Sequence, residues 1–193
     1  MQVVNLTPAQ LRDILSLRRV LWVLGVVALC LSGVSAQSPT AGEYQVKATF
    51  LYNFAKFVEW RPSSFSDASA PLRICVFGQD PFGQELRNIT SEKTVNGRQL
   101  QVDQVVDLQL ARTCHILFIA SSDKAELKRI FEDLRGTDVL TVGDTKGFAE
   151  LGGIINFVLE DDRVHFEVNR KAADQAGLKI SSKLLSVAKR VIG

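Results

Sequence analysis

Histidine, cysteine and methionine are scarce in this chain, which holds two histidines, three cysteines and one methionine among 193 residues. His115 and His165 both stand in apolar runs typical of strands, and neither has a second ligand at the spacing that a metal site requires. Cys114 and His115 are adjacent, so in a strand their side chains would point to opposite faces and would not pair as nucleophile and base. The sequence therefore predicts no metal site, and we interpret both histidines as structural.

Motifs of catalysis and of cofactor binding are also missing. The segment GQDPFG (78–83) has neither the lysine and hydroxyl of a phosphate-binding loop nor the G-x-G-x-x-G pattern. The Gly-x-Ser-x-Gly nucleophile motif does not occur. Carboxylates cluster only at Glu160–Asp162, where a solvated turn explains them. We predict no catalytic residues, no cofactor and no enzymatic activity.

The chain has little excess charge, with a formal net charge of +2. Residues 1–36 account for three arginines and one aspartate, which leaves 20 basic and 20 acidic side chains in the remainder. Because binding to nucleic acid requires a large basic surplus, we exclude nucleic acid as a partner.

No apolar run is long enough to be a typical transmembrane helix. Val20–Leu31 is about 12 residues long, whereas a spanning helix needs roughly 17 to 25. Arg18 and Arg19 precede this run, and small side chains follow it up to Ala36, as in a secretory signal peptide. We predict a signal peptide over residues 1–36, a short tether over 37–42, export to the periplasm and no stable membrane insertion after cleavage. A retained membrane anchor is the alternative.

Two cysteines, Cys75 and Cys114, remain after this leader. An even number of cysteines in an oxidising compartment predicts one disulfide. A reactive thiol is the alternative, although the wide separation of the two cysteines disfavours a thiol-redox enzyme.

The remaining pattern alternates strands with helices. Strands are predicted at 72–77, 99–105, 115–120 and 139–143, and an antiparallel hairpin at 154–159 and 164–168. Helices are predicted at 43–60, 81–89, 124–134, from Arg170 to Gly177, and from Ser181 or Ser182 to the end, the last one directing Leu184, Leu185, Val187, Ala188 and Val191 inward. This order predicts an α/β fold over residues 43–193: a mixed, mostly parallel sheet flanked by helices on both faces, as a Rossmann-like three-layer sandwich.

The first predicted helix, 43–60, carries two apolar stripes. One stripe contains Val46, Phe50, Phe54 and Phe57, and the neighbouring one contains Tyr44, Ala48, Leu51, Ala55 and Val58. A helix on a sheet needs only one stripe, so the second should meet another helix, another subunit or a partner protein. Lys47 lies within this apolar arc, and we predict that it is a buried charge beside a cluster of carboxylates or carbonyls.

Several segments together resemble the YfiR-like periplasmic proteins. They are EYQVKATFLYNFAKFVEW, PLRICVFGQDPFG, CHILFIASS, LTVGDTKGFAELGGIINF, RVHFEVN and AADQAGLKISSKLLSVA, which follow one another through most of residues 43–190. The resemblance implies an α/β fold and a disulfide between Cys75 and Cys114. Some members have a second bridge around GFAELGG, where this chain has Ala149 and Asn156.

The resemblance also implies a function and a partner. Known members are periplasmic homodimers that bind the periplasmic region of a membrane diguanylate cyclase and hold it inactive. The predicted partner-binding residues lie on the first helix and in the 148–153 loop, and they are Tyr44, Leu51, Tyr52, Phe148, Gly152 and Gly153. The alternative is a small-ligand receptor with its site at the carboxyl ends of the strands, near Gly78, Ser121 and Gly143.

Overall fold

A computed structural model describes residues 41–120 and 124–193 of the chain. The predicted signal peptide, most of the predicted tether and Ser121 of the alternative ligand site lie outside the described residues. The chain runs through α2 (Ala41–Phe57), β1 (Val58–Glu59), η1 (Pro62–Ser64), β2 (Leu72–Phe77), α3 (Glu85–Thr90), β3 (Thr94–Val95), β4 (Arg98–Val105), α4 (Leu108–Ala111), β5 (Ile116–Ile119), α5 (Lys124–Asp133), β6 (Leu140–Gly143), β7 (Ile155–Glu160), β8 (Arg163–Asn169), α6 (Arg170–Gln175), β9 (Lys179–Ile180), α7 (Ser182–Val187) and β10 (Arg190–Ile192). Among these helices none has the length and apolar content to cross a membrane.

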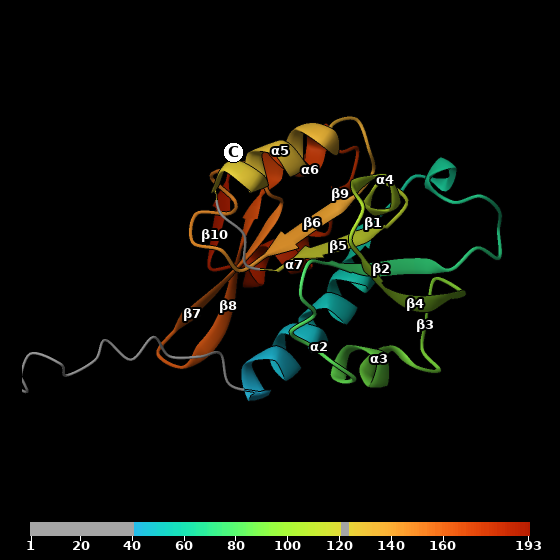
Figure 1. Ribbon diagram of the computed structural model, residues 1–193, viewed down its shortest axis with the longest axis horizontal. Helices are drawn as coiled ribbons and strands as arrows, with labels where there is room; N and C mark the ends of the chain where they lie inside the picture. Colours follow the sequence, from blue (N-terminus) through green and yellow to red (C-terminus); the bar gives the residue numbers. More distant parts are fainter. Residues whose placement is uncertain (1–40, 121–123) are drawn as a thin grey trace, which may run out of the picture. The chain divides into compact units, whose positions relative to one another are not determined.

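Eight strands of the described chain form one sheet in the order β10-β8-β7-β6-β5-β2-β4-β3 (Figure 1). Neighbouring strands are parallel except in the β7–β8 and β3–β4 hairpins. The chain moves from β2 outward to β4, then returns to the other side of β2 to build β5 and β6. The predicted α/β fold with a mixed, mostly parallel sheet is confirmed.

Two hydrophobic cores lie on the two faces of this sheet, because side chains of a strand alternate between faces. In β5, Ile116 and Phe118 belong to the core that contains α2, α3 and α7. Leu117 and Ile119 belong to the second core, which contains side chains of α4 and α5. In Figure 1, α2 and α3 lie below the sheet and α5 lies above it. This is the three-layer arrangement that the sequence predicts.

The aromatic side chains of α2 explain how this helix is held. Phe50 and Phe54 pack against Phe157 of β7 and Phe166 of β8, with ring centroids 5.2 to 5.9 Å apart. The helix also packs against α3 and α7, and its second apolar stripe is largely buried. Elements of the same domain therefore cover that stripe, whereas Val46 of the first stripe is 44% exposed.

Two predicted boundaries near the N-terminal half are wrong. The first helix ends at Phe57 rather than Trp60, because Val58 and Glu59 pair with β9 as an antiparallel strand. The next helix begins at Glu85 rather than near Pro81. The side chain of Asp80 accepts a hydrogen bond from the backbone N–H of Phe82 and forms a local turn instead of a helix cap.

The predicted end of the chain is also corrected. The last helix stops at Val187, and Arg190–Ile192 forms β10, a strand parallel to β8. Val187 is 67% exposed and Val191 is 44% exposed, so neither is directed inward as predicted. The backbone N–H of Lys189 donates to the carbonyl of Phe166 in β8. One edge of β8 would otherwise be unpaired, so the end of the chain forms a strand along that edge instead of continuing the helix.

Candidate functional site

Lys47 is buried in an ionic cluster where α2 meets the end of β6. Its side chain is 4% exposed, and its Nζ lies 2.5 Å from Glu43 Oε1 and 2.6 Å from Asp144 Oδ2. The hydroxyl of Tyr44 donates to the same Asp144 oxygen, and the Lys47 ammonium lies 4.4 Å from the centre of the Tyr44 ring. The predicted carboxylate cluster is confirmed. Two carboxylates and one aromatic face replace the water that a buried ammonium loses.

This cluster fills the carboxyl end of β6, close to where the alternative ligand site is predicted. The ring of Phe82 contacts Tyr44 at 5.4 Å and Phe118 at 4.8 Å, both edge to face. Burial raises the pKa of the Tyr44 hydroxyl, and the charge of Asp144 raises it further. The Lys47 ammonium is shared between Glu43 of the same helix and Asp144 after β6, so the cluster holds α2 to the sheet.

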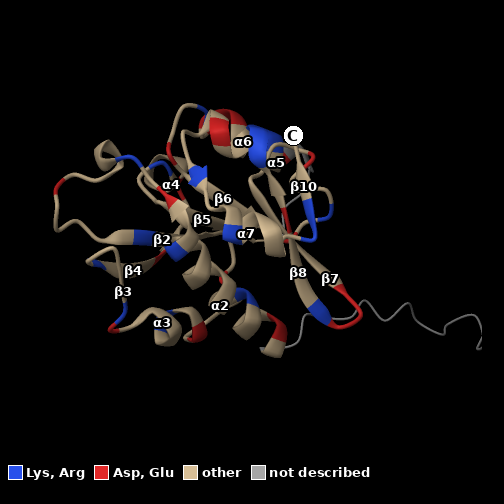
Figure 2. Ribbon diagram, turned by 180° about the vertical axis from the view of Figure 1, so that it is seen from behind, with Lys and Arg blue, Asp and Glu red and all other residues tan. Residues whose placement is uncertain are grey.

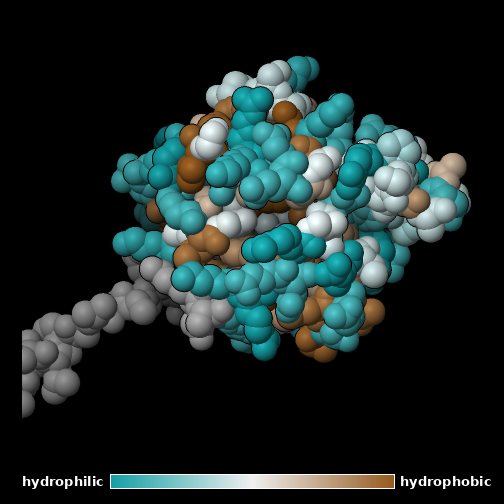
Figure 3. All heavy atoms as spheres, turned by 90° about the horizontal axis from the view of Figure 1, so that it is seen from above, coloured by the Kyte–Doolittle hydropathy of each residue, from teal (hydrophilic) through white to brown (hydrophobic). Residues whose placement is uncertain are grey.

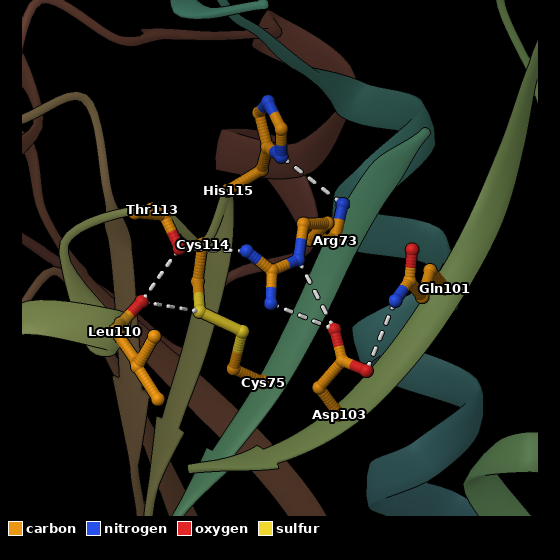
Figure 4. Close-up of polar contacts among 8 residues, drawn as sticks. All are labelled: Arg73, Cys75, Gln101, Asp103, Leu110, Thr113, Cys114 and His115. Carbon is orange, nitrogen blue, oxygen red and sulfur yellow. Dashed lines mark hydrogen bonds and ion pairs between the residues drawn. A yellow bond between two sulfur atoms is a disulfide. The ribbon is translucent and has the colours of Figure 1, made fainter. Parts of the chain in front are cut away.

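The disulfide joins β2 to Cys114, which lies two residues before β5. Figure 4 shows the bond between Cys75 and Cys114. Their Cα atoms lie 6.0 Å apart. Both residues are buried in the second core, at 0% and 4% exposure. The predicted bridge is confirmed, and with both sulfur atoms bonded the structure gives no support to the reactive-thiol alternative.

Arg73 ties together the strands beside this bridge (Figure 4). Its Nε and Nη2 donate to Asp103 Oδ2 of β4 at 3.1 and 2.9 Å, and its Nη1 donates to Thr113 Oγ1 at 2.6 Å. The guanidinium therefore links β4, β2 and the segment that leads into β5. The sequence did not indicate this role, because Asp103 and Thr113 are 30 and 40 residues away along the chain.

His115 is bonded through both ring nitrogens and is 7% exposed. Its Nδ1 accepts from the backbone N–H of Arg73 at 3.0 Å, and its Nε2 lies 3.1 Å from the carbonyl oxygen of Ser64. A carbonyl only accepts, so Nε2 carries the proton and the ring is neutral. Burial lowers the pKa of His115, and the positive charges of Arg73 and Arg98 lower it further. The geometry agrees with a structural histidine.

The predicted partner-binding residues divide into buried and accessible ones. Leu51 and Phe148 are fully buried, and Gly153 is also buried, so these three residues do not reach the surface of the chain by itself. The Phe148 ring is wedged between Gly143 and Gly153, where an added Cβ would overlap it. Partner contact stays a prediction for the three accessible residues, Tyr44, Tyr52 and Gly152.

The GFAELGG region, where the resemblance implies a second bridge in some members, is held here by polar contacts. Asn156 is 3% exposed and donates to Glu167 Oε2 at 3.1 Å. Arg190 of β10 pairs with Glu167 at 2.8 Å and also with Glu150. Burial acts to raise the pKa of Glu167, but the hydrogen bond from Arg190 is the larger influence and holds the pKa below its usual value. Ion pairs thus join β8, β10 and the loop before β7.

The described residues contain no group of three histidine, cysteine or acidic side chains placed to hold a metal ion. The sequence prediction did not name the carboxylates that pair with Lys47. Glu43 could have been identified, because it lies four residues before Lys47 on the same helix. Asp144 is 97 residues from Lys47, and only the folded chain brings the two together.

Comparison with known proteins gives the family. The model of the YfiR/HmsC-like family matches residues 44–189. Among solved structures, a conserved domain protein from Vibrio cholerae O1 biovar El Tor is similar at 10% identity and a TM-score of 0.53, with 77% of this chain and 60% of that chain covered. An ABC domain in complex with L-Trp from Streptococcus pneumoniae is a looser likeness, at 11% identity, 62% and 55% coverage and a TM-score of 0.46. The chain thus spans 60% of the length of the Vibrio protein, and that likeness shows only the fold. The match over residues 44–189 shows that the chain belongs to the YfiR/HmsC-like family.

Proposed function

We propose that this protein binds the periplasmic region of an inner-membrane diguanylate cyclase and holds the enzyme inactive. The observation that carries the proposal is the family match over residues 44–189, since the family suggests periplasmic regulators of cyclic di-GMP signalling. In this function the protein is a non-catalytic subunit that acts by contact alone. Its loss would raise cyclic di-GMP and promote biofilm formation.

The accessible part of α2 supports a docking role for Tyr52. The Tyr52 ring is half-buried, and the ammonium of Lys93 lies 4.5 Å from its centre while that of Lys56 lies 5.3 Å away. Neither ammonium has a carboxylate partner within 4.0 Å among the ion pairs of the described chain. Tyrosine is enriched at the centres of interfaces, because it buries a large rigid ring and keeps a hydroxyl for hydrogen bonding.

Figure 2 shows the side that carries α2 and α3, where acidic and basic side chains are interspersed among other residues. Another face fits a docking role less well. The face above α5 and α6 is mostly hydrophilic, with separate hydrophobic patches (Figure 3). We propose that the cyclase docks on the α2 side and that the protein acts as a homodimer.

A complementation assay tests the proposal. Deletion of the gene should raise cellular cyclic di-GMP, and the wild-type chain should restore the low level. Tyr52→Ser should fail to restore it, because the docking ring is removed, whereas Val106→Ser is the matched control at an 81% exposed apolar residue elsewhere. Both variants should reach wild-type amounts in the periplasmic fraction. Unchanged cyclic di-GMP in the deletion strain would refute the proposal.

A small-ligand sensor is the second candidate, favoured by one cavity. A space of about 280 Å³ lies between α5 and α6, with Phe131, Thr141 and Gly152 in its wall. It is away from the carboxyl ends of the strands, where the sequence placed a ligand. If the protein is such a sensor, a screen of small metabolites should find one that changes the melting temperature of the wild type in a saturable way. The change should differ in a Phe131→Trp variant, because Phe131 is in the wall of the cavity.

A further inference from the structure

The His115 imidazole is one of the groups that hold the loop of residues 61–71 against the amino ends of β2 and β5. Arg98 also binds the loop, by donating to the carbonyl oxygens of Asp67 and Ala70. The loop contributes the Ser64 carbonyl to His115 Nε2, and the ring of Phe65 stacks on the imidazole at 4.3 Å. Trp60, just before the loop, meets the same imidazole edge to face at 6.2 Å. On the other side, His115 Nδ1 accepts the backbone N–H of Arg73 in β2. His115 thus connects the loop to the sheet through two hydrogen bonds and two ring contacts.

We propose that His115 is a proton-operated clamp, whose protonation frees the loop of residues 61–71 and opens access to the Cys75–Cys114 disulfide. The proposal is independent of the cyclase as partner, because it concerns only contacts within this chain.

Protonation removes one of the two hydrogen bonds. A doubly protonated imidazole has no acceptor, so Nδ1 can no longer receive the Arg73 N–H, and two N–H groups then face each other. That backbone N–H would remain buried and unpaired while the clamp stays closed. A buried unpaired donor is costly, so the protonated ring favours the open loop.

The charges around the ring also oppose a positive imidazole. Arg73 on β2 lies beside it, and Arg98 on β4 lies 3.8 Å from the far side of the Phe65 ring. Asp138, before β6, is the nearby carboxylate, but it already pairs with Arg61 and accepts from Ser64 Oγ at 2.6 Å. Burial acts to raise the pKa of Asp138, and these hydrogen bonds more than offset it, so the pKa stays below its usual value. The charges of Arg73 and Arg98 thus both act to lower the pKa of His115, although Arg73 is paired with Asp103 and Arg98 donates to the carbonyls of Asp67 and Ala70.

The closed position of the loop should become less stable as the pH falls. Because the pKa of His115 is lowered in the closed state, an open loop with an ordinary histidine binds protons more readily. The closed state has its full stability above about pH 6.5 and loses it as the pH falls below that value towards the lowered pKa. Within this window the open fraction rises by up to about tenfold per pH unit.

The loop is also one wall of a cavity that reaches the disulfide. The cavity has a volume of about 310 Å³, with Arg61 and Ser64 of the loop on one side and Cys114 and His115 on the other. Cys114 is only 4% exposed while the loop is closed. When the loop leaves, this polar cavity widens into solvent beside Cys114, so a reductant gains access to the bridge from that side.

The test uses the full chain carrying Trp22→Phe, so that Trp60 is the single tryptophan of the two in the sequence. Trp60 emission is followed from about pH 8 to about pH 5. At each pH the rate of bridge reduction by a water-soluble phosphine is divided by the rate for a small disulfide. We expect an emission change below about pH 6.5, with a normalised reduction rate that rises severalfold over the same range.

Two matched variants complete the test. His115→Asn keeps an acceptor near Arg73 but does not titrate, so both pH dependences should disappear, whereas His165→Asn should leave them unchanged. Equal slopes for the wild type and His115→Asn would overturn the proposal. If His115→Asn does not fold, the ring ¹⁵N shifts of wild-type His115 decide: protonation that does not coincide with the Trp60 change overturns it as well.

Discussion

At the scale of single residues, Lys47 is the side chain whose burial is most costly, because its ammonium is enclosed by protein. The pattern of α2 places this lysine inside an apolar arc, and that placement alone requires a counter-charge. The sequence predicts that Lys47 needs a carboxylate beside it, and Glu43, four residues earlier on the same helix, is one of the two. The second carboxylate, that of Asp144, lies just after β6, and its contact with Lys47 depends on how α2 lies across the sheet.

Lys47→Met should lower the free energy of unfolding by about 3 to 5 kcal/mol, because it leaves Glu43 and Asp144 buried without their cation. Urea unfolding at neutral pH measures the loss. Lys146→Met, at an exposed position of the next loop, is the control and should change stability by less than about 0.5 kcal/mol. A Lys47→Met chain as stable as the control would show that the cluster is not a stabilising contact.

At the scale of elements, the start of the last helix follows from side-chain chemistry, whereas helix ends set by distant strands do not. The start predicted near Pro81 is wrong, because Asp80 forms a local turn. The sequence offers Ser181 and Ser182 as the start of the last helix, and the structure selects Ser181, whose hydroxyl accepts from the Leu184 N–H. By contrast, α2 stops at Phe57 because β9 is present to pair with the next two residues. Likewise, β10 forms because β8 has a free edge beside it. Local helix and strand propensities predict neither the end of α2 nor the formation of β10.

The N-cap leads to a paired prediction. Ser181→Ala should destabilise the protein by about 1 kcal/mol, since the N–H of Leu184 loses its acceptor at a helix end. Ser182→Ala, one residue later, should be nearly neutral, because Ser182 is exposed and alanine favours helix. Thermal unfolding of the two variants under identical conditions gives the difference. Equal melting temperatures would mean that the cap contributes nothing here.

At the scale of the whole molecule, one sheet separates two cores, and the disulfide belongs to only one of them. Cys75 and Cys114 lie among the side chains that pack with α4 and α5, whereas the aromatic residues of α2 lie in the opposite core. The sequence predicts this division, because alternating strands buried on both faces require two cores. It does not predict the contribution of Arg73, which reinforces the bridge from β2 to Thr113.

Removal of the bridge should therefore act unevenly. The double variant Cys75→Ala, Cys114→Ala should lose about 4 kcal/mol of stability, the loop-entropy value for a bridge that spans 39 residues. Hydrogen exchange should show the earliest loss of protection in residues 106–115, since this segment is held to β2 by the bridge and by Arg73. The amides of α2 should remain protected until global unfolding, because the α2 rings pack in the other core. If residues 106–115 and α2 lose protection together, the two cores unfold as one unit and the bridge stabilises the molecule only through its unfolded state.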